Sequence, residues 1–102
     1  MMNQERRLVT IVVSPEIEDV FVDWLLERPE LERFNTYQVK SYNKNHDDYT
    51  LTEKVTGWKR KIAVRVLFPT EVIDDVLTAM RAKFGNTGIY YRITPFYEDG
   101  TI

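Results

Sequence analysis

One pattern occurs twice in this chain: a strand-like run, a proline or threonine, and then an amphipathic helix. The first copy covers Leu8 to Leu26 and the second covers Ile62 to Ala82. Four apolar residues of the first predicted helix have apolar counterparts 56 positions later in the second. Ile17, Val20, Phe21 and Trp24 correspond in this order to Ile73, Val76, Leu77 and Met80. Two βαβ units in about a hundred residues predict the ferredoxin-like βαββαβ fold, an α+β fold whose antiparallel four-stranded sheet carries two helices on one face.

Four strands are predicted. Leu8 to Val13 is apolar at both alternating sets of positions, which is typical of a central strand. Phe34 to Tyr42 has no strongly apolar set, which indicates an edge strand. Lys61 to Phe68 and Ile89 to Phe96 complete the sheet, and right-handed crossovers give the order fourth, first, third, second.

Helix ends are marked by short polar motifs. Ser14 and Thr70 are predicted to cap the two long helices, and Pro29 is predicted to end the first of them. Thr50 and Glu53 have the spacing of a capping box, and Gly57 stands where a helix would end. A short helix is therefore predicted inside the connection from Asn43 to Trp58.

Length and composition limit the class of protein. The 102 residues suit one domain, residues 1–102, and the balance of apolar and charged residues is that of a folded chain. A net charge of −2 argues against a nucleic-acid partner, and the lack of cysteine excludes disulfides and thiolate metal sites. Neither a signal peptide nor a membrane span is recognisable, so we expect a cytoplasmic protein.

The sheet face opposite the helices is expected to stay uncovered while it carries apolar residues such as Leu67 and Tyr90. An apolar face without a cover predicts self-association or a ligand. Arg65 and Arg92 interrupt this face, and each could pair with a subunit carboxylate or hold an anion. Ion pairing between subunits is the more economical interpretation.

A second group of cations precedes the third strand. Lys59, Arg60 and Lys61 follow Gly57 and Trp58, and such a run could bind a phosphate or an acidic partner. Because successive strand residues point to opposite faces, Arg60 is expected to diverge from its neighbours. Protection of the strand entry from edge pairing is the simpler explanation of the run.

The connection also carries His46, Asp47 and Asp48, the one cluster in the sequence with metal-ligand chemistry. These residues could hold a divalent metal, particularly if symmetry brings several copies together. They are also the residue types of an ordinary solvated turn. With neighbouring Tyr49 and Trp58, they make this loop the predicted contact surface for a partner.

Four stretches together resemble a proteobacterial family of unknown function that is grouped with the PII-like signalling proteins. The stretches, which span almost the whole chain, are VTIVVSPEIEDVFVDW from Val9, TLTEKVTGWKRK from Thr50, VRVLFPTEVIDDVLTAM from Val64, and IYYRITPFYEDGTI from Ile89.

The resemblance implies a homotrimer with sheets facing inward and a loop between the second and third strands, here Asn43 to Trp58, that acts on a partner such as a membrane transporter. It also implies that the protein binds a small effector, which could be an adenine nucleotide, an anion or a metal. A further implication is an association with heavy-metal efflux. Gly85 to Gly88 is a weak substitute for the glycine-rich phosphate segment of PII proteins.

We do not expect an enzyme, because the single histidine has only sequence-adjacent carboxylates and no nucleophile or phosphate-binding motif is present. The alternatives are a small cofactor-free oxygenase, which the ferredoxin-like fold also hosts, and a heavy-metal-binding protein. No cofactor is specified by the sequence.

Overall fold

The computed structural model describes residues 5–31 and 33–102. Four strands form one antiparallel sheet in the order β2-β3-β1-β4, as predicted. The strands are β1 (Arg6–Val13), β2 (Phe34–Ser41), β3 (Lys59–Pro69) and β4 (Tyr90–Pro95). The fold is therefore α+β with a ferredoxin-like arrangement.

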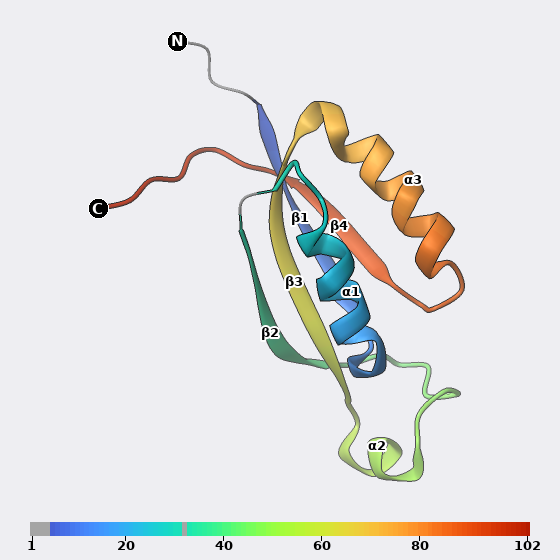
Figure 1. The fold of residues 1–102 in the computed structure, drawn as a ribbon. Coiled ribbons are helices and arrows are strands. Elements are labelled where there is room, and N and C mark those ends of the chain that lie inside the picture. The colour runs from blue at the N-terminus through green and yellow to red at the C-terminus, as the bar shows by residue number, and fades with distance from the viewer. Residues whose placement is uncertain (1–4, 32) are drawn as a thin grey trace.

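Two helices, α1 (Glu18–Leu26) and α3 (Ile73–Phe84), lie on the same side of the sheet (Figure 1). Each is preceded by one 3-10 turn, η1 (Pro15–Ile17) or η2 (Thr70–Val72). The short helix α2 (Leu51–Thr56) lies beyond the end of the sheet (Figure 1). Among the described residues, no helix has the length and apolar content needed to cross a bilayer.

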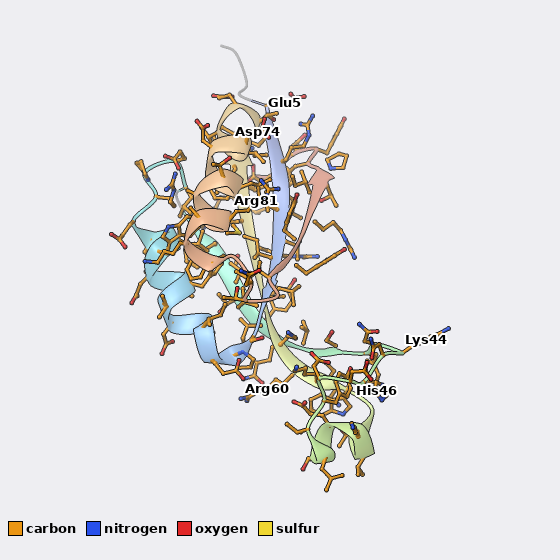
Figure 2. The ribbon with its side chains drawn as sticks, turned by 90° about the vertical axis from the view of Figure 1, so that its right-hand side faces the viewer. Glu5, Lys44, His46, Arg60, Asp74 and Arg81 are labelled. Atoms are coloured by element: carbon orange, nitrogen blue, oxygen red, sulfur yellow. The ribbon has the colours of Figure 1, made fainter. Side chains whose placement is uncertain are left out.

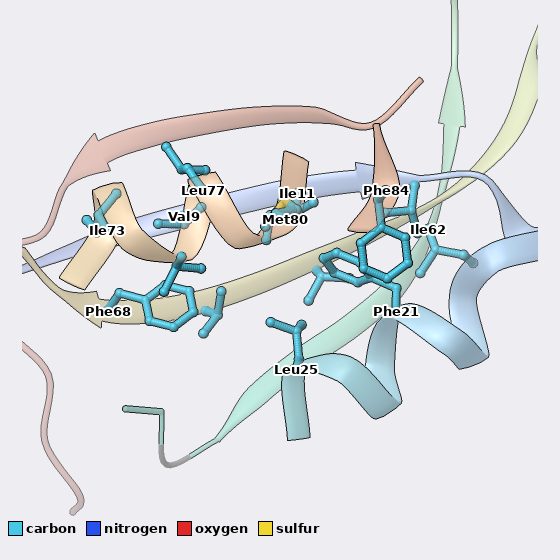
Figure 3. Packing of buried hydrophobic residues seen from close by; sticks show 14 residues of the cluster. Val9, Ile11, Phe21, Leu25, Ile62, Phe68, Ile73, Leu77, Met80 and Phe84 are labelled. Carbon is cyan, nitrogen blue, oxygen red and sulfur yellow. The ribbon is translucent and has the colours of Figure 1, made fainter. Parts of the chain in front are cut away.

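The core fills the layer between the helices and the sheet (Figure 3). Alternate residues of the central strands face it, because side chains of a strand point to opposite faces in turn. Phe21 of α1 contacts Phe84 of α3 edge to face, with ring centroids 5.3 Å apart. The buried cluster consists of Val9, Ile11, Val13, Phe21, Leu25, Ile62, Val64, Val66, Phe68, Ile73, Val76, Leu77, Met80 and Phe84.

The two copies of the sequence pattern are not equivalent in the structure. Val76 of α3 is buried as expected, but the matching residue of α1, Val20, is 53% exposed, and Leu25 is buried instead. The rings of Phe21 and Trp24 both reach Phe84 and fill the space between the helices. The core-facing stripe of α1 is therefore narrower than the prediction that included Val20.

The predicted caps of the two long helices are wrong. Neither Ser14 nor Thr70 makes a side-chain capping bond. The Ser14 hydroxyl accepts a hydrogen bond from Lys61 Nζ at 3.1 Å, and the Thr70 hydroxyl donates to the Glu5 carbonyl at 3.2 Å. Each hydroxyl instead links residues near the ends of β1 and β3. The 3-10 turns come between these hydroxyls and the first amides of the α-helices, so the hydroxyls do not cap them.

Candidate functional site

The connection between β2 and β3 projects past the sheet as an ordered extension. Figure 2 shows Lys44 and His46 on this projection, at the opposite end of the molecule from Glu5. The predicted capping box is present: Thr50 Oγ1 accepts from the Glu53 amide at 3.2 Å, and Glu53 Oε1 accepts from the Thr50 amide at 2.9 Å. Gly57 ends α2 at φ 85°, in the left-handed region that glycine adopts without strain.

Tyr49 anchors this extension and is its one buried residue among those described, with 8% exposure. Its hydroxyl donates to the Ser41 carbonyl at 3.3 Å, and the His46 ring stacks on it with centroids 4.3 Å apart. Lys59 lies over the same ring, with Nζ 5.9 Å from the centroid. The sequence identified Tyr49 as a partner contact, but the structure places its ring inside the extension.

His46, Asp47 and Asp48 do not gather into a metal site within one chain. The His46 ring is engaged by Tyr49, and the Asp48 carboxylate pairs with Lys59 Nζ at 3.0 Å. Across residues 5–31 and 33–102, no group of three histidine, aspartate or glutamate side chains could hold a metal ion. Whether several copies together bind a metal stays a prediction.

The Asp48–Lys59 pair links the loop to the start of β3. The hydrogen bond from Lys59 holds the pKa of Asp48 below its ordinary value, and the same bond raises the pKa of Lys59. Because Asp48 is 74% exposed, solvent and salt screen the pair strongly. The pair therefore guides the loop's position and adds little to overall stability.

Acid should loosen the extension through this pair. When the pKa of a carboxylate is lower in the folded state than in the unfolded state, the carboxylate stabilises the fold at pH values above its unfolded-state pKa. This stabilisation is lost as the pH falls through the folded-state pKa. Amide exchange around Tyr49 should therefore accelerate, relative to the core, as the pH falls below about 4. Asp48→Asn should remove this pH dependence when exchange is followed by NMR.

Asp47→Asn is the matched control, because Asp47 makes no ion pair among the described residues and its backbone amide, which donates to Asn45 Oδ1 at 3.0 Å, is unchanged. Equal exchange rates for the two variants at every pH would contradict a positioning role for the Asp48 carboxylate.

The outer face of the extension is apolar where α2 meets solvent. Leu51 and Val55 are each 81% exposed and stand four residues apart, so they lie on one face of the helix. Tyr42 is also exposed and lines a shallow, open groove with Asn43, Lys44, His46 and Gly57. Trp58, in contrast, is half-buried and contacts Lys40, whose Nζ lies 5.0 Å from its ring centroid.

The basic run Lys59 to Lys61 divides between the two sheet faces, as predicted. Lys59 and Lys61 pair in register with Ser41 and Val39, whereas Arg60 pairs with Lys40 on the opposite face. Lys59 and Lys61 are already hydrogen-bonded within the chain, to Asp48 and Ser14. A single chain therefore does not present the three cations as one anion site.

Arg65 and Arg92 lie on the sheet face that no helix covers. The register aligns Asn35, Arg65, Thr10 and Arg92 in one row across the four strands. Both arginines are exposed, and each guanidinium lies over a tyrosine ring of its own chain, Tyr37 for Arg65 and Tyr90 for Arg92. The sequence placed both residues on this face correctly.

A cavity of about 220 Å³ lies between the end of α3 and β4, and three residues of the Gly85 to Gly88 segment that the sequence marked, Gly85, Asn86 and Gly88, line it. Met80 and Phe84 form its apolar wall, and Arg81 donates to the Tyr91 hydroxyl at 3.2 Å beside it. The adjoining turn requires glycine at Gly85, where a Cβ would lie 2.8 Å from the Arg81 carbonyl oxygen. The cavity is smaller than the roughly 300–1,000 Å³ of typical ligand pockets.

Comparison with known proteins agrees with this fold. A crystal structure of a DUF3240 family protein from Shewanella baltica OS155 superposes with a TM-score of 0.78 at 21% identity, covering 99% of each chain. A Bacillus cereus protein related to NIF3 has a TM-score of 0.67 at 12% identity; the match covers 99% of this chain and 27% of that one. At these identities the two structures establish the fold alone.

No curated protein matches the sequence. The sequence profile of the family described as "Protein of unknown function (DUF3240)" matches residues 2–102. Because the match spans nearly the whole length, the chain belongs to the DUF3240 family.

Proposed function

We propose that this protein is a PII-like, cytoplasmic regulatory subunit that self-associates through its open sheet face and contacts a partner through residues 43–58. The observation that carries the proposal is the extension itself. It is internally ordered by the capping box and by Tyr49, yet it exposes Leu51 and Val55 to solvent. Because α2 is ordered although its apolar residues are not buried within the chain, we infer that this surface contacts another molecule.

A binding role is favoured over catalysis by the placement of the polar groups. The single histidine lies on a shallow groove in the extension, away from the cavity beside α3. The lining of that cavity contains no imidazole or carboxylate to act as a base. We therefore favour a binding role over the chemistry of an oxygenase or hydrolase.

The proposed effector is a small anion or a nucleotide held between subunits. Arg65 and Arg92 supply two exposed guanidinium groups without a carboxylate partner among the described residues. The cavity beside α3 is too small for a whole nucleotide, so such a ligand would need surface from a second copy. A thermal-shift screen with nucleotides, bicarbonate and divalent metals tests this, because a ligand of the folded state raises Tm.

The class of partner that we propose is a membrane transporter. A capture experiment on membranes of the source organism tests the partner surface. Wild-type protein should retain a binding protein that Leu51→Ser combined with Val55→Ser loses, because that change removes the exposed apolar pair of α2. Val20→Ser is the matched control, since Val20 is an exposed valine on α1. Identical retained proteins for all three would refute the proposed surface.

A further inference from the structure

The open sheet face has a layered pattern of apolar and cationic residues. The row that contains Arg65 and Arg92 lies between two apolar rows. Leu67 pairs with Leu8 on one side, and Ala63 pairs with Val12 on the other. Leu8, Leu67 and Val12 are partly exposed, whereas Ala63 is buried, so the first three residues supply the apolar surface on the two sides of the charged row.

The C-terminal tail, residues 96–102, has the complementary chemistry, and two of its residues, Phe96 and Asp99, contact Arg6. Figure 1 shows it leaving the sheet as an isolated segment. Tyr97 is 99% exposed and Ile102 is fully exposed. Glu98, which stands beside Tyr97, makes no ion pair among the described residues. The tail thus presents apolar residues and a free carboxylate.

Arg6 fixes the direction in which this tail leaves the chain. Its guanidinium pairs with Asp99 at 2.8 Å and lies 5.3 Å from the centre of the Phe96 ring. Hydrogen bonding to Arg6 holds the pKa of Asp99 below its ordinary value, so this carboxylate is charged at neutral pH. The root of the tail is anchored, and the residues around the anchor face solvent.

We propose that the C-terminal tail of one copy lies across the open sheet face of a second copy, with Glu98 between Arg65 and Arg92 and with Ile102, on the same side of the extended tail as Glu98, on a flanking apolar row. The inference rests on the self-association proposed above and names the segment that achieves it. The occupant of the face is a second copy of this chain.

The tail is long enough to cross the sheet face. Seven extended residues reach about 23 Å, and the four strands of the sheet span about 15 Å from first to last. A contact between a tail and a face is heterologous, and such contacts close into rings when the rotation between copies allows it. Three copies related in this way would form a closed trimer in which each copy gives one tail and receives one.

Charge reversal across the contact is the first test. Glu98→Lys and Arg92→Glu should each weaken self-association about tenfold, and the two together should largely restore it, because the ion pair re-forms with reversed polarity. The association constant is measured by sedimentation equilibrium. Glu27→Lys, which reverses an exposed charge at the end of α1, is the control and should change nothing.

Cysteine crosslinking provides a test that does not depend on the strength of the ion pair. The chain has no cysteine, so a disulfide between two copies that each carry a single new cysteine must be intermolecular. Glu98→Cys in one copy should crosslink with Arg92→Cys in another, in about tenfold excess over the helix-face control Lys83→Cys, because a disulfide needs Cα atoms within about 7 Å.

The outcomes separate this inference from the proposed function. An oligomer that is insensitive to Glu98→Lys and that crosslinks no better at Arg92 than at Lys83 would overturn the tail contact and leave self-association standing. A wild-type monomer at micromolar concentration would overturn both. A chain ending at Pro95 that keeps its Tm but loses association would support the tail contact.

Discussion

Replacing Phe21 by alanine should lower the free energy of unfolding by about 3–5 kcal/mol, the cost of a large cavity in a packed core. Phe21 is fully buried where α1, α3 and the sheet meet. Its ring contacts Phe84 at 5.3 Å and Trp24 at 5.9 Å between centroids, so its removal leaves a cavity beside both rings. Urea denaturation followed by circular dichroism measures the change.

Val20→Ala is the matched control for this substitution, because Val20 precedes Phe21 on the same helix and is 53% exposed. Its effect should stay within about 0.5 kcal/mol, as is usual for surface positions. If the two variants lost similar stability, the assignment of the core-facing stripe of α1 would be wrong.

Val12→Asp should disrupt self-association by at least about 100-fold while the chain stays folded. Val12 lies on the central strand β1, between Ala63 and Tyr90 on the open face. A carboxylate there would lose its hydration in the assembly, which costs several kcal/mol, but it would remain in contact with water in the isolated chain. Light scattering should then report a monomer, and circular dichroism should report an unchanged fold.

Val20→Asp is the control for the assembly prediction. It places the same charge on an exposed valine of the helix layer, on the opposite side of the sheet. The molar mass should stay that of wild type. Loss of assembly in Val20→Asp alone would indicate that the helix layer, rather than the open sheet face, forms the interface.

Much of the fold could be predicted from local patterns. The alternation in the four strands and the right-handed crossovers were enough for the observed strand order. The capping box of Thr50 and Glu53 and the end at Gly57 were also predicted, because each depends on residues three to four positions apart. Such short-range sequence signals can be recognised without knowing the tertiary contacts of the rest of the chain.

Predictions failed where packing between distant elements decides the outcome. Val20 has the same spacing as the buried Val76, but aromatic rings occupy the space between the helices and leave it exposed. Leu25 could have been found four positions after Phe21, a spacing that places both on one helix face. The sequence marked the Gly85 to Gly88 turn beside α3 but not the cavity that the turn lines, because the cavity's walls come from two separate elements.

Some features of the candidate site could likewise be predicted from the sequence, whereas others required the structure. The extension and the face of Arg65 and Arg92 were both predicted, since a long connection and strand alternation are visible in one dimension. The structure alone showed that Tyr49 is internal, that Asp48 is paired with Lys59, and that Arg6 holds the tail. These contacts join residues that no periodic pattern relates.

The doubled strand and helix pattern by itself determined the element order, the sheet and the side on which both helices lie, because alternation and crossover handedness leave few other arrangements. The tertiary structure decided which valine of the repeat is buried, how the extension is anchored, and where the tail points. Those features depend on side chains that meet across the fold, and close packing admits only the combinations whose shapes and charges fit.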